Sequence, residues 1–282
     1  MDETRRSRTI EIPAIMRALH QTLDGDPKIL LDPIAPRLID ADERRAWLTP
    51  LLAHPFAKQW RAGFALRARY VEDALAEAVQ SGVGQYLILG AGLDTFAYRQ
   101  PTWASGLRVY DLDHPVSQQW KKDRLKASGI PIPSNSQFVP IDFERMSIAE
   151  GLNGSGFFFE MTALCSWMGV TQYLTADALD ATLRFVLSLP AASEIIFSFI
   201  LPQETVSGVE AEALALAAQR SAEVGEPWLT RFHPEELATK LGAMGFSRIV
   251  HLTPEDARRC YFDNRTDGLA ERHGEQLMRA MV

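Results

Sequence analysis

The chain has 282 residues, of which 46% are hydrophobic and 23% charged, and its formal net charge is −7. This acidic balance, with a pI of about 5.4, argues against a general nucleic-acid-binding protein. No apolar run is long enough to cross a bilayer, and two cysteines are too few for a disulfide framework or a Cys-only zinc site.

The segment before the first strand has helical patterns. The N-terminus lacks the apolar stretch of a secretory signal, so we expect a cytoplasmic protein. Apolar residues recur at helical spacing after Pro13, three prolines bend the connection 27–38, and a long helix is expected between about 58 and 80. We therefore expect an N-terminal helical extension over 1–80 and a main domain over 81–282.

Strand-like and helix-like segments alternate in the main domain. The expected strands are 85–89, 107–112, 137–141, 162–167, 194–200 and 246–252. The expected helices are 94–99, 115–129, 176–189, 203–223 and 234–244. The final segment, 275–282, fits either a strand or a helix. This alternation predicts an α/β fold with a mostly parallel sheet covered by helices on both faces.

A glycine turn follows the first strand. Gly90, Ala91 and Gly92 come directly after four apolar residues, and Asp94 and Thr95 suit the start of a helix. Such turns lie at the carboxyl ends of strands, where nucleotide-like ligands bind. The third glycine of the dinucleotide fingerprint is absent, because Thr95 stands there. The alternative is a tight strand-to-helix turn without a ligand.

A carboxylate ends the second expected strand. Asp113 follows Gly92 at a spacing typical of residues that accept hydrogen bonds from a ribose. The alternative is that Asp113 caps a helix that begins at His114-Pro115. The spacing favours the ribose role.

Several segments, in order, resemble motifs of the leucine carboxyl methyltransferase-like family. The strongest likeness is the glycine motif LGAGLDTFAYR at 89–99. Further similar segments are 7–9 with 17–19, 31–35, 67–73, 167–175 and 261–269. The resemblance covers nearly the whole chain. It implies a Rossmann-like class I methyltransferase fold with a seven-stranded sheet, and S-adenosylmethionine (SAM) as cofactor.

The resemblance also implies cofactor-binding residues. Arg67 would pair with the methionine carboxylate of SAM, with Arg69 as a rival and a surface charge as the alternative reading. The glycine turn, including Ala91, would bring bare backbone to the cofactor, and Asp113 would hold the ribose. Asp142 would accept from the adenine amino group beside Phe143, unless it only caps a strand end.

The acceptor side is less defined by the sequence. Trp167 and Tyr173 are aromatic candidates for the substrate pocket, although plain core packing is at least as good an account of Trp167. Tyr173 and His233 are the nearest candidates for a general base, and His233 also suits a helix cap. The family motif has a glutamate where this chain has Met168. We recognise no metal-binding cluster.

Together these features predict a SAM-dependent methyltransferase acting on oxygen of a small-molecule carboxylate or hydroxyl acceptor. Residues 203–230 have no place in the minimal sheet and are expected to form a helical lid insertion together with the N-terminal extension. Two alternatives remain open at this point: a SAM-binding protein without methyl transfer, and an NAD(P)-dependent oxidoreductase. Neither nucleic acid nor a membrane is an expected partner.

Overall fold

The computed structural model describes residues 10–40 and 52–282, so the expected motif at 7–9 lies outside the described residues. One seven-stranded sheet organises the fold, in the order β3-β2-β1-β4-β5-β7-β6. The strands are β1 Gln85–Leu89, β2 Arg108–Asp113, β3 Ser136–Pro140, β4 Ala163–Trp167, β5 Glu194–Ile200, β6 Arg248–Leu252 and β7 Glu275–Met281. This sheet confirms the predicted α/β fold.

The strand β7 decides the ambiguity at the end of the sequence. It lies between β5 and β6 and pairs antiparallel with both, whereas the pairs among β1 to β5 are parallel. Its position explains why local pattern did not resolve it, because its partners are remote in the chain.

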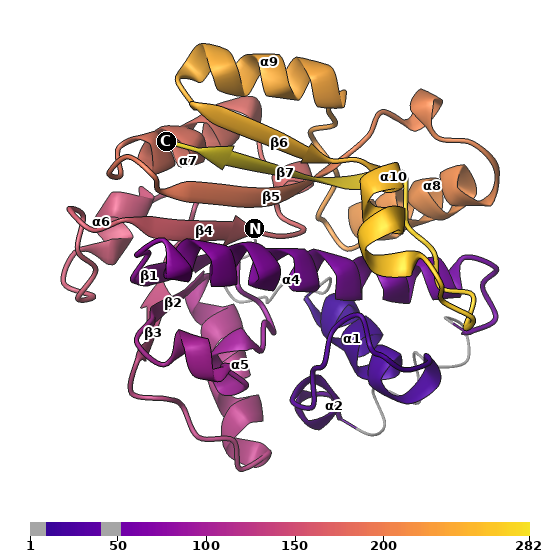
Figure 1. Ribbon diagram of the computed structural model, residues 1–282, viewed down its shortest axis with the longest axis horizontal. Helices are drawn as coiled ribbons and strands as arrows, with labels where there is room; N and C mark the ends of the chain where they lie inside the picture. The colour runs from indigo at the N-terminus through magenta and orange to yellow at the C-terminus, as the bar shows by residue number, and fades with distance from the viewer. Residues whose placement is uncertain (1–9, 41–51) are drawn as a thin grey trace.

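Helices cover the sheet and extend beyond it (Figure 1). The α-helices are α1 Glu11–Leu23, α2 Ala35–Leu38, α4 Ala57–Gln80, α5 Pro115–Ala127, α6 Ile148–Leu152, α7 Ala176–Leu187, α8 Gly208–Glu223, α9 Pro234–Met244 and α10 Pro254–Ala257. Short 3-10 turns cover Phe96–Tyr98, Thr102–Ala104, Thr171–Tyr173 and Gln203–Thr205, and a π-helical turn covers Arg258–Phe262. No helix among the described residues has the length and apolar character needed to span a membrane.

The structure corrects two of the expected helices. The short helix expected near 94–99 is only a 3-10 turn, Phe96–Tyr98, so no α-helix begins directly at the glycine turn. The expected helix over 203–223 is interrupted, because α8 begins at Gly208, whose φ is +62°. The backbone of the glycine turn, rather than a helix terminus, therefore faces whatever binds there.

The alternation of side chains along the central strands builds two core layers. Leu87 and Leu89 pack on one face of the sheet with residues of α7 and α9, while Tyr86 and Ile88 pack on the other face with α4. β1, β4 and β5 are buried throughout. Strands buried on both faces require continuous apolar runs, which is why these three were readable from sequence.

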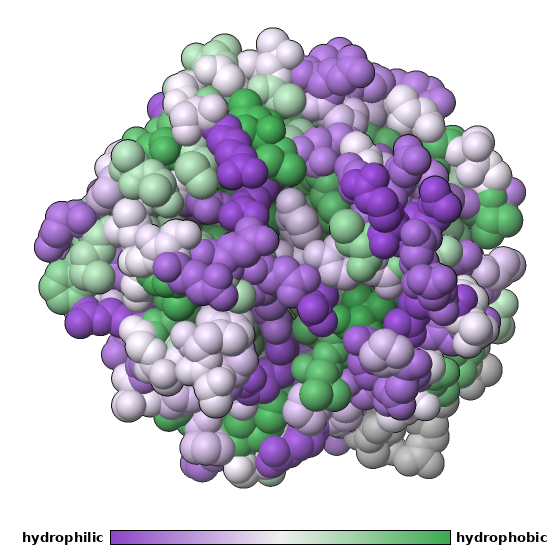
Figure 2. Space-filling view, viewed as in Figure 1, coloured by the Kyte–Doolittle hydropathy of each residue, from purple (hydrophilic) through white to green (hydrophobic). Residues whose placement is uncertain are grey.

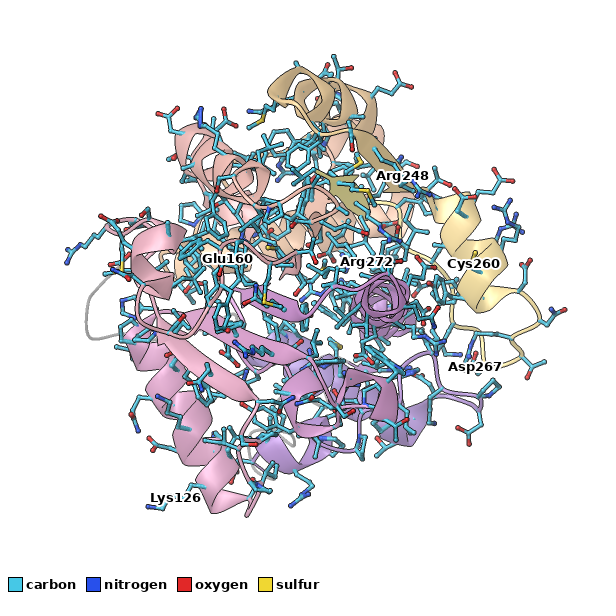
Figure 3. The ribbon with its side chains drawn as sticks, turned by 60° about the vertical axis from the view of Figure 1, so that its left-hand side comes forward. Lys126, Glu160, Arg248, Cys260, Asp267 and Arg272 are labelled. Atoms are coloured by element: carbon cyan, nitrogen blue, oxygen red, sulfur yellow. The ribbon has the colours of Figure 1, made fainter. Side chains whose placement is uncertain are left out.

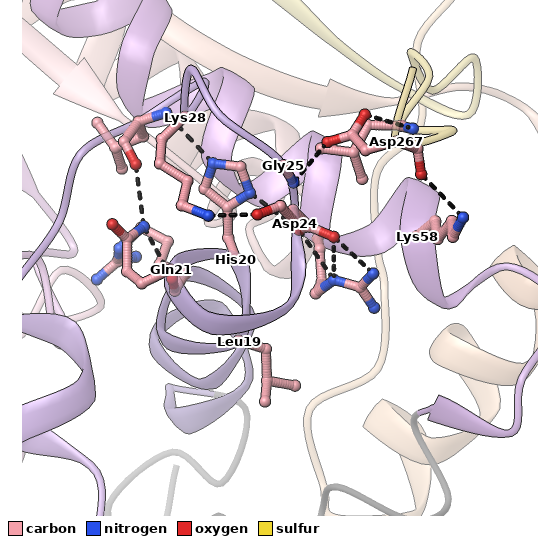
Figure 4. A network of polar contacts seen from close by, with 12 residues as sticks. Leu19, His20, Gln21, Asp24, Gly25, Lys28, Lys58 and Asp267 are labelled. Atoms are coloured by element: carbon pink, nitrogen blue, oxygen red, sulfur yellow. Dashed lines mark hydrogen bonds and ion pairs between the residues drawn. The ribbon is translucent and has the colours of Figure 1, made fainter. Parts of the chain in front are cut away.

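A polar network fixes the N-terminal helices to the rest of the molecule (Figure 4). Asp24, just after α1, accepts hydrogen bonds from Arg61 of α4 and shares one with His20 (2.9 Å). Burial alone would raise the pKa of Asp24, but the hydrogen bonds from His20 and Arg61 outweigh it and lower the pKa. Gly25 N donates to Asp267 of the C-terminal segment (2.9 Å). The segment after α1 and the segment before β7 therefore meet beside α4.

The surface seen in Figure 2 mixes polar and apolar residues without one broad apolar area on that face. Scattered apolar side chains of this kind are ordinary for a folded protein. On this face, therefore, no broad apolar patch marks a docking surface.

Candidate active site

A cavity of about 800 Å³ opens at the carboxyl ends of β1, β2 and β4. Figure 1 shows α1 and α8 on the side of the molecule to which the parallel strands point. The cavity is lined by the glycine turn, by α1 and α4, and by residues of α8 with the segment 224–229. Carboxyl ends of parallel strands are where α/β folds bind ligands.

The glycine turn forms the floor of the cavity. Gly90 has a φ of +65° and Gly92 a φ of +48°, a region that L side chains rarely adopt. A Cβ at position 90 would lie 2.5 Å from Val170 Cγ2. Ala91 lines the cavity between them, and its N–H is directed to Leu112 O (3.0 Å). The turn therefore leaves backbone, and no side chain, at its two glycines.

Asp113 stands at the end of β2 beside this turn and lines the cavity. Its carboxylate accepts hydrogen bonds from Gly92 N (2.5 Å) and His114 N (2.6 Å). Burial raises the pKa of Asp113, and these two hydrogen bonds partly offset that rise. The carboxylate therefore holds the glycine turn and also faces the cavity. The helix that follows is capped by the His114 side chain, which accepts from Val116 N, so the alternative reading of Asp113 as the cap of this helix is wrong.

The structure separates the two arginines that competed for one role. Arg67 lines the cavity, is buried, and donates from Nη1 to Glu275 Oε1 (2.8 Å). Burial lowers the pKa of Arg67, and Glu275 partly offsets that shift. Arg69 is half-exposed, pairs with Asp73 and is not among the cavity residues. Of these two arginines, only Arg67 lines the cavity and can reach a ligand there.

Asp142 and Phe143 follow β3 and line the opposite part of the cavity. Asp142 Oδ1 accepts from Glu144 N (3.0 Å), which closes a local turn. Phe143 packs against the larger core layer. Asp142 thus closes the turn after β3, as expected for a cap at a strand end, and it also lines the cavity.

The acceptor-side expectations fare differently. Tyr173 lines the cavity, but Trp167 has no exposed surface and packs against Phe197, with ring centroids 6.2 Å apart. The expectation that Trp167 lines the substrate pocket is corrected, because its position on β4 points the ring into the core. His233 is also outside the cavity, and its side chain makes no capping hydrogen bond. The cavity lining therefore supports Tyr173, rather than His233, as the candidate base.

Sequence reasoning gave no role to several charged residues of the cavity wall. They include Arg17, Arg272 and Glu275. Arg17 lies in a segment that resembles a family motif, yet no role was assigned to it. Arg272 and Glu275 lie beyond every recognised motif, and Arg67 is 208 positions before Glu275. No local signal could have found this contact.

A profile of the leucine carboxyl methyltransferase family matches residues 10–187. The chain belongs to this family. A Bacillus subtilis protein, YktD, provisionally named an S-adenosyl-L-methionine-dependent methyltransferase, is 33% identical over 205 residues, which are 72% of this chain and 67% of the relative.

Solved structures agree with the fold. A DUF574 family protein of Streptomyces avermitilis superposes with a TM-score of 0.62 at 16% identity, covering 99% of this chain and 98% of that one. A Thermobifida fusca protein provisionally described as a methyltransferase gives 0.58 at 17% identity, covering 96% and 94%. At these identities the likeness concerns the fold, which is that of class I methyltransferases.

SAM is the cofactor of leucine carboxyl methyltransferase family enzymes such as this one, and the cavity residues fit it. An arginine suits its carboxylate, a buried carboxylate beside the glycine turn suits its ribose diol, and the ring of Phe143 offers an apolar wall. Gly90 also fits this role, because a Cβ there would occupy space beside Val170, and its absence lets the backbone of the turn approach a ligand.

Substituting Gly90 by alanine tests that cradle. The expected result is a loss of stability from the positive φ, about 1–2 kcal/mol, plus a further 1–3 kcal/mol or so because Val170 must move. Cofactor affinity should fall as well. Urea unfolding and calorimetry with SAM measure the two effects.

Gly154→Ala is the matched control. Gly154 has a φ of +78° with no described atom within 4 Å of the added Cβ. Gly154→Ala should therefore lose only the stability that the positive φ costs an alanine, and its SAM affinity should be unchanged. Equal losses at positions 90 and 154 would contradict a steric role for Gly90.

Proposed function

We propose that this protein transfers the methyl group of SAM to an oxygen of a small-molecule acceptor, either a carboxylate or a hydroxyl. The observation that carries the proposal is a continuous cavity that runs from the glycine turn to α8 and Tyr173. Its volume of about 800 Å³ lies toward the upper end of small-molecule pockets, roughly 300–1,000 Å³. That leaves room for an acceptor beside a cofactor.

In this proposal the chain's main contribution is alignment. Arg67 would hold the methionine carboxylate of the cofactor and Asp113 its ribose, with the glycine turn beside them. The cofactor supplies an electrophilic methyl group on a cationic sulfur. Tyr173 and Trp228 line the cavity and offer aromatic faces to that cation. A carboxylate acceptor attacks with its own lone pair and releases no proton, so no base is needed.

We assign the closing of the site to two parts of the chain, the N-terminal extension over 1–80 and the lid insertion over 203–230. Supporting this, the described residues of α1 and α4 line one wall, while α8 and the segment 224–229 line the other. Leu229 N donates to Gln172 O (2.6 Å), which joins the lid to the loop after β4. Such a cover excludes water from the transfer.

The first experiment is calorimetry with SAM, S-adenosylhomocysteine and NAD. We expect the first two to bind and NAD not to bind. Incubation with labelled SAM and metabolite pools, followed by mass spectrometry, would then identify the methylated product. Tight NAD binding without SAM binding would refute the proposal.

The pH–rate profile separates the two acceptor classes. A carboxylate acceptor is already ionised, so the rate should be flat through roughly pH 6–8. A hydroxyl acceptor needs a base, and we propose Tyr173, which lines the cavity, for this role. A rising profile that disappears in Tyr173→Phe would favour the hydroxyl. His233→Ala, outside the cavity, is the control and should leave the profile unchanged.

A further inference from the structure

Two buried arginines share one glutamate at the wall of the cavity. We call Arg67, Glu275 and Arg272 the two-arginine cluster. Arg67 Nη1 donates to Glu275 Oε1 (2.8 Å), and Arg272 Nη1 donates to Glu275 Oε2 (2.7 Å). The three side chains are 10%, 9% and 9% exposed, and all three residues line the cavity. Figure 3 shows Arg272 in the interior beside α4, far from peripheral residues such as Lys126.

The cluster carries a surplus of positive charge. Two guanidinium groups face one carboxylate, and each oxygen of that carboxylate already accepts a hydrogen bond. Within the described part of the chain, the buried Nε of Arg272 has no hydrogen-bond partner. A buried, incompletely paired cation is costly, so an anionic ligand would complete the site.

Among the described residues, Glu275 is the one carboxylate that forms an ion pair with Arg67 or Arg272. Other acids line the cavity, and of these Glu72 pairs with Arg99 and Asp94 accepts a hydrogen bond from Phe96 N. Arg17, a further cation of the cavity wall, donates to Asp32 (3.0 Å) and to Leu93 O (2.7 Å). Asp113, across the cavity, is engaged by the backbone N–H groups of the glycine turn and His114. Met168, also on the wall, adds no charge.

The backbone makes room for both guanidinium groups. A Cβ at Gly63 of α4 would lie 2.2 Å from Arg272 Cδ, and a Cβ at Gly169 would lie 2.9 Å from Arg67 Nη1. The ring of Phe64 lies 4.5 Å from Arg67 Cζ and 5.8 Å from Arg272 Cζ. Two glycines and one aromatic ring therefore hold the arginines in fixed positions, as a preorganised anion site requires.

From this geometry we infer that Arg272 binds a carboxylate of the methyl acceptor, while Arg67 serves the carboxylate of SAM. The inference rests on the proposed function and narrows the acceptor to a small acid. The carboxylate held by Arg272 is distinct from the oxygen that is methylated. Pairing the reacting carboxylate would stabilise a negative charge that methylation removes, and so would raise the barrier.

The acceptor class is therefore a dicarboxylic acid or a hydroxy acid. In the transfer, the reacting oxygen bonds to the methyl carbon as the carbon–sulfur bond breaks and its electrons go to sulfur. A second carboxylate reacts without loss of a proton, whereas a hydroxyl gives its proton to a base. The carboxylate on Arg272 is unchanged, so Arg272 determines specificity and takes no part in the bond changes.

Binding measurements on the full chain test this assignment. Protein saturated with S-adenosylhomocysteine is titrated with succinate, glutarate and 3-hydroxybutyrate, and with their methyl esters. We expect at least one acid to bind and its ester to bind at least about tenfold more weakly, the loss of one charge-assisted hydrogen bond. Arg272→Gln should lose the acid to a similar extent and keep its affinity for S-adenosylhomocysteine within about twofold.

Arg272→Gln is expected to fold, because Glu275 keeps the hydrogen bond from Arg67. If Arg272→Gln does not fold, Arg272→Lys replaces it in the test, because lysine retains the charge but not the planar fork. Arg272→Lys should weaken acid binding and leave S-adenosylhomocysteine binding unchanged. Three results would overturn the inference: none of the acids binds the wild type, acids bind both variants as well as the wild type, or the variants lose S-adenosylhomocysteine affinity. Failure of the wild type to bind S-adenosylhomocysteine would instead refute the proposed function.

Discussion

Asp113→Ala is expected to lower the affinity for SAM by at least tenfold. Hydrogen bonds to a charged acceptor contribute roughly 1.5–3 kcal/mol each, and a ribose diol can make two of them. The substitution also removes the acceptor for Gly92 N and His114 N, so the glycine turn loses support. Calorimetry with SAM measures the affinity, and thermal unfolding measures the loss of stability.

Asp123→Ala is the matched control for this experiment. Asp123 lies on α5, where it accepts a hydrogen bond from Gln119 at the exposed surface (3.0 Å). It should leave SAM affinity unchanged. If Asp113→Ala lowers the melting temperature and keeps full SAM affinity, Asp113 supports the turn and does not bind the cofactor.

Lys121→Met is expected to destabilise the fold by about 3–5 kcal/mol, because it leaves a buried charge without its partner. Lys121 of α5 and Asp111 of β2 have side chains that are each 1% exposed, and they form an ion pair between the helix and the strand. The Lys121 ammonium also lies 5.6 Å from the ring centroid of Tyr98. Urea unfolding of the variant at neutral pH measures the change in the free energy of unfolding.

Two further variants complete this test. Lys126→Met makes the same substitution on the exposed end of α5, where Figure 3 shows the side chain at the periphery, and should change stability by no more than about 0.5 kcal/mol. Lys121→Met combined with Asp111→Leu should recover most of the loss, since it removes both buried charges. A single Lys121→Met variant as stable as the wild type would show that the pair contributes nothing net.

The central sheet and the cofactor end of the site could be predicted from contiguous residues. β1, β4 and β5 are buried on both faces, so their apolar runs are visible in the sequence. The glycine turn and Asp113 were predictable for a related reason. Carboxyl ends of neighbouring parallel strands meet at one edge, so motifs that follow β1 and β2 must lie close together.

The residue type of an individual side chain was a weaker guide to which residues line the cavity. The aromatic character of Trp167 and the titratable ring of His233 suggested the pocket, but neither residue lines it. Which way a side chain points depends on the packing around its strand or loop, and composition carries no record of that. Arg67 and Arg69 differ in the same respect, since they lie on different faces of one helix.

The sequence alone therefore determined six of the seven strands, the glycine turn, the place of Asp113 beside it and the family, because each depends on neighbouring residues or on a fixed order of motifs. The two-arginine cluster was decided by the tertiary structure. It exists because β7 inserts antiparallel between β5 and β6 and brings Glu275 to Arg67. A contact across 208 positions depends on the closing of the whole sheet, and no local pattern encodes it.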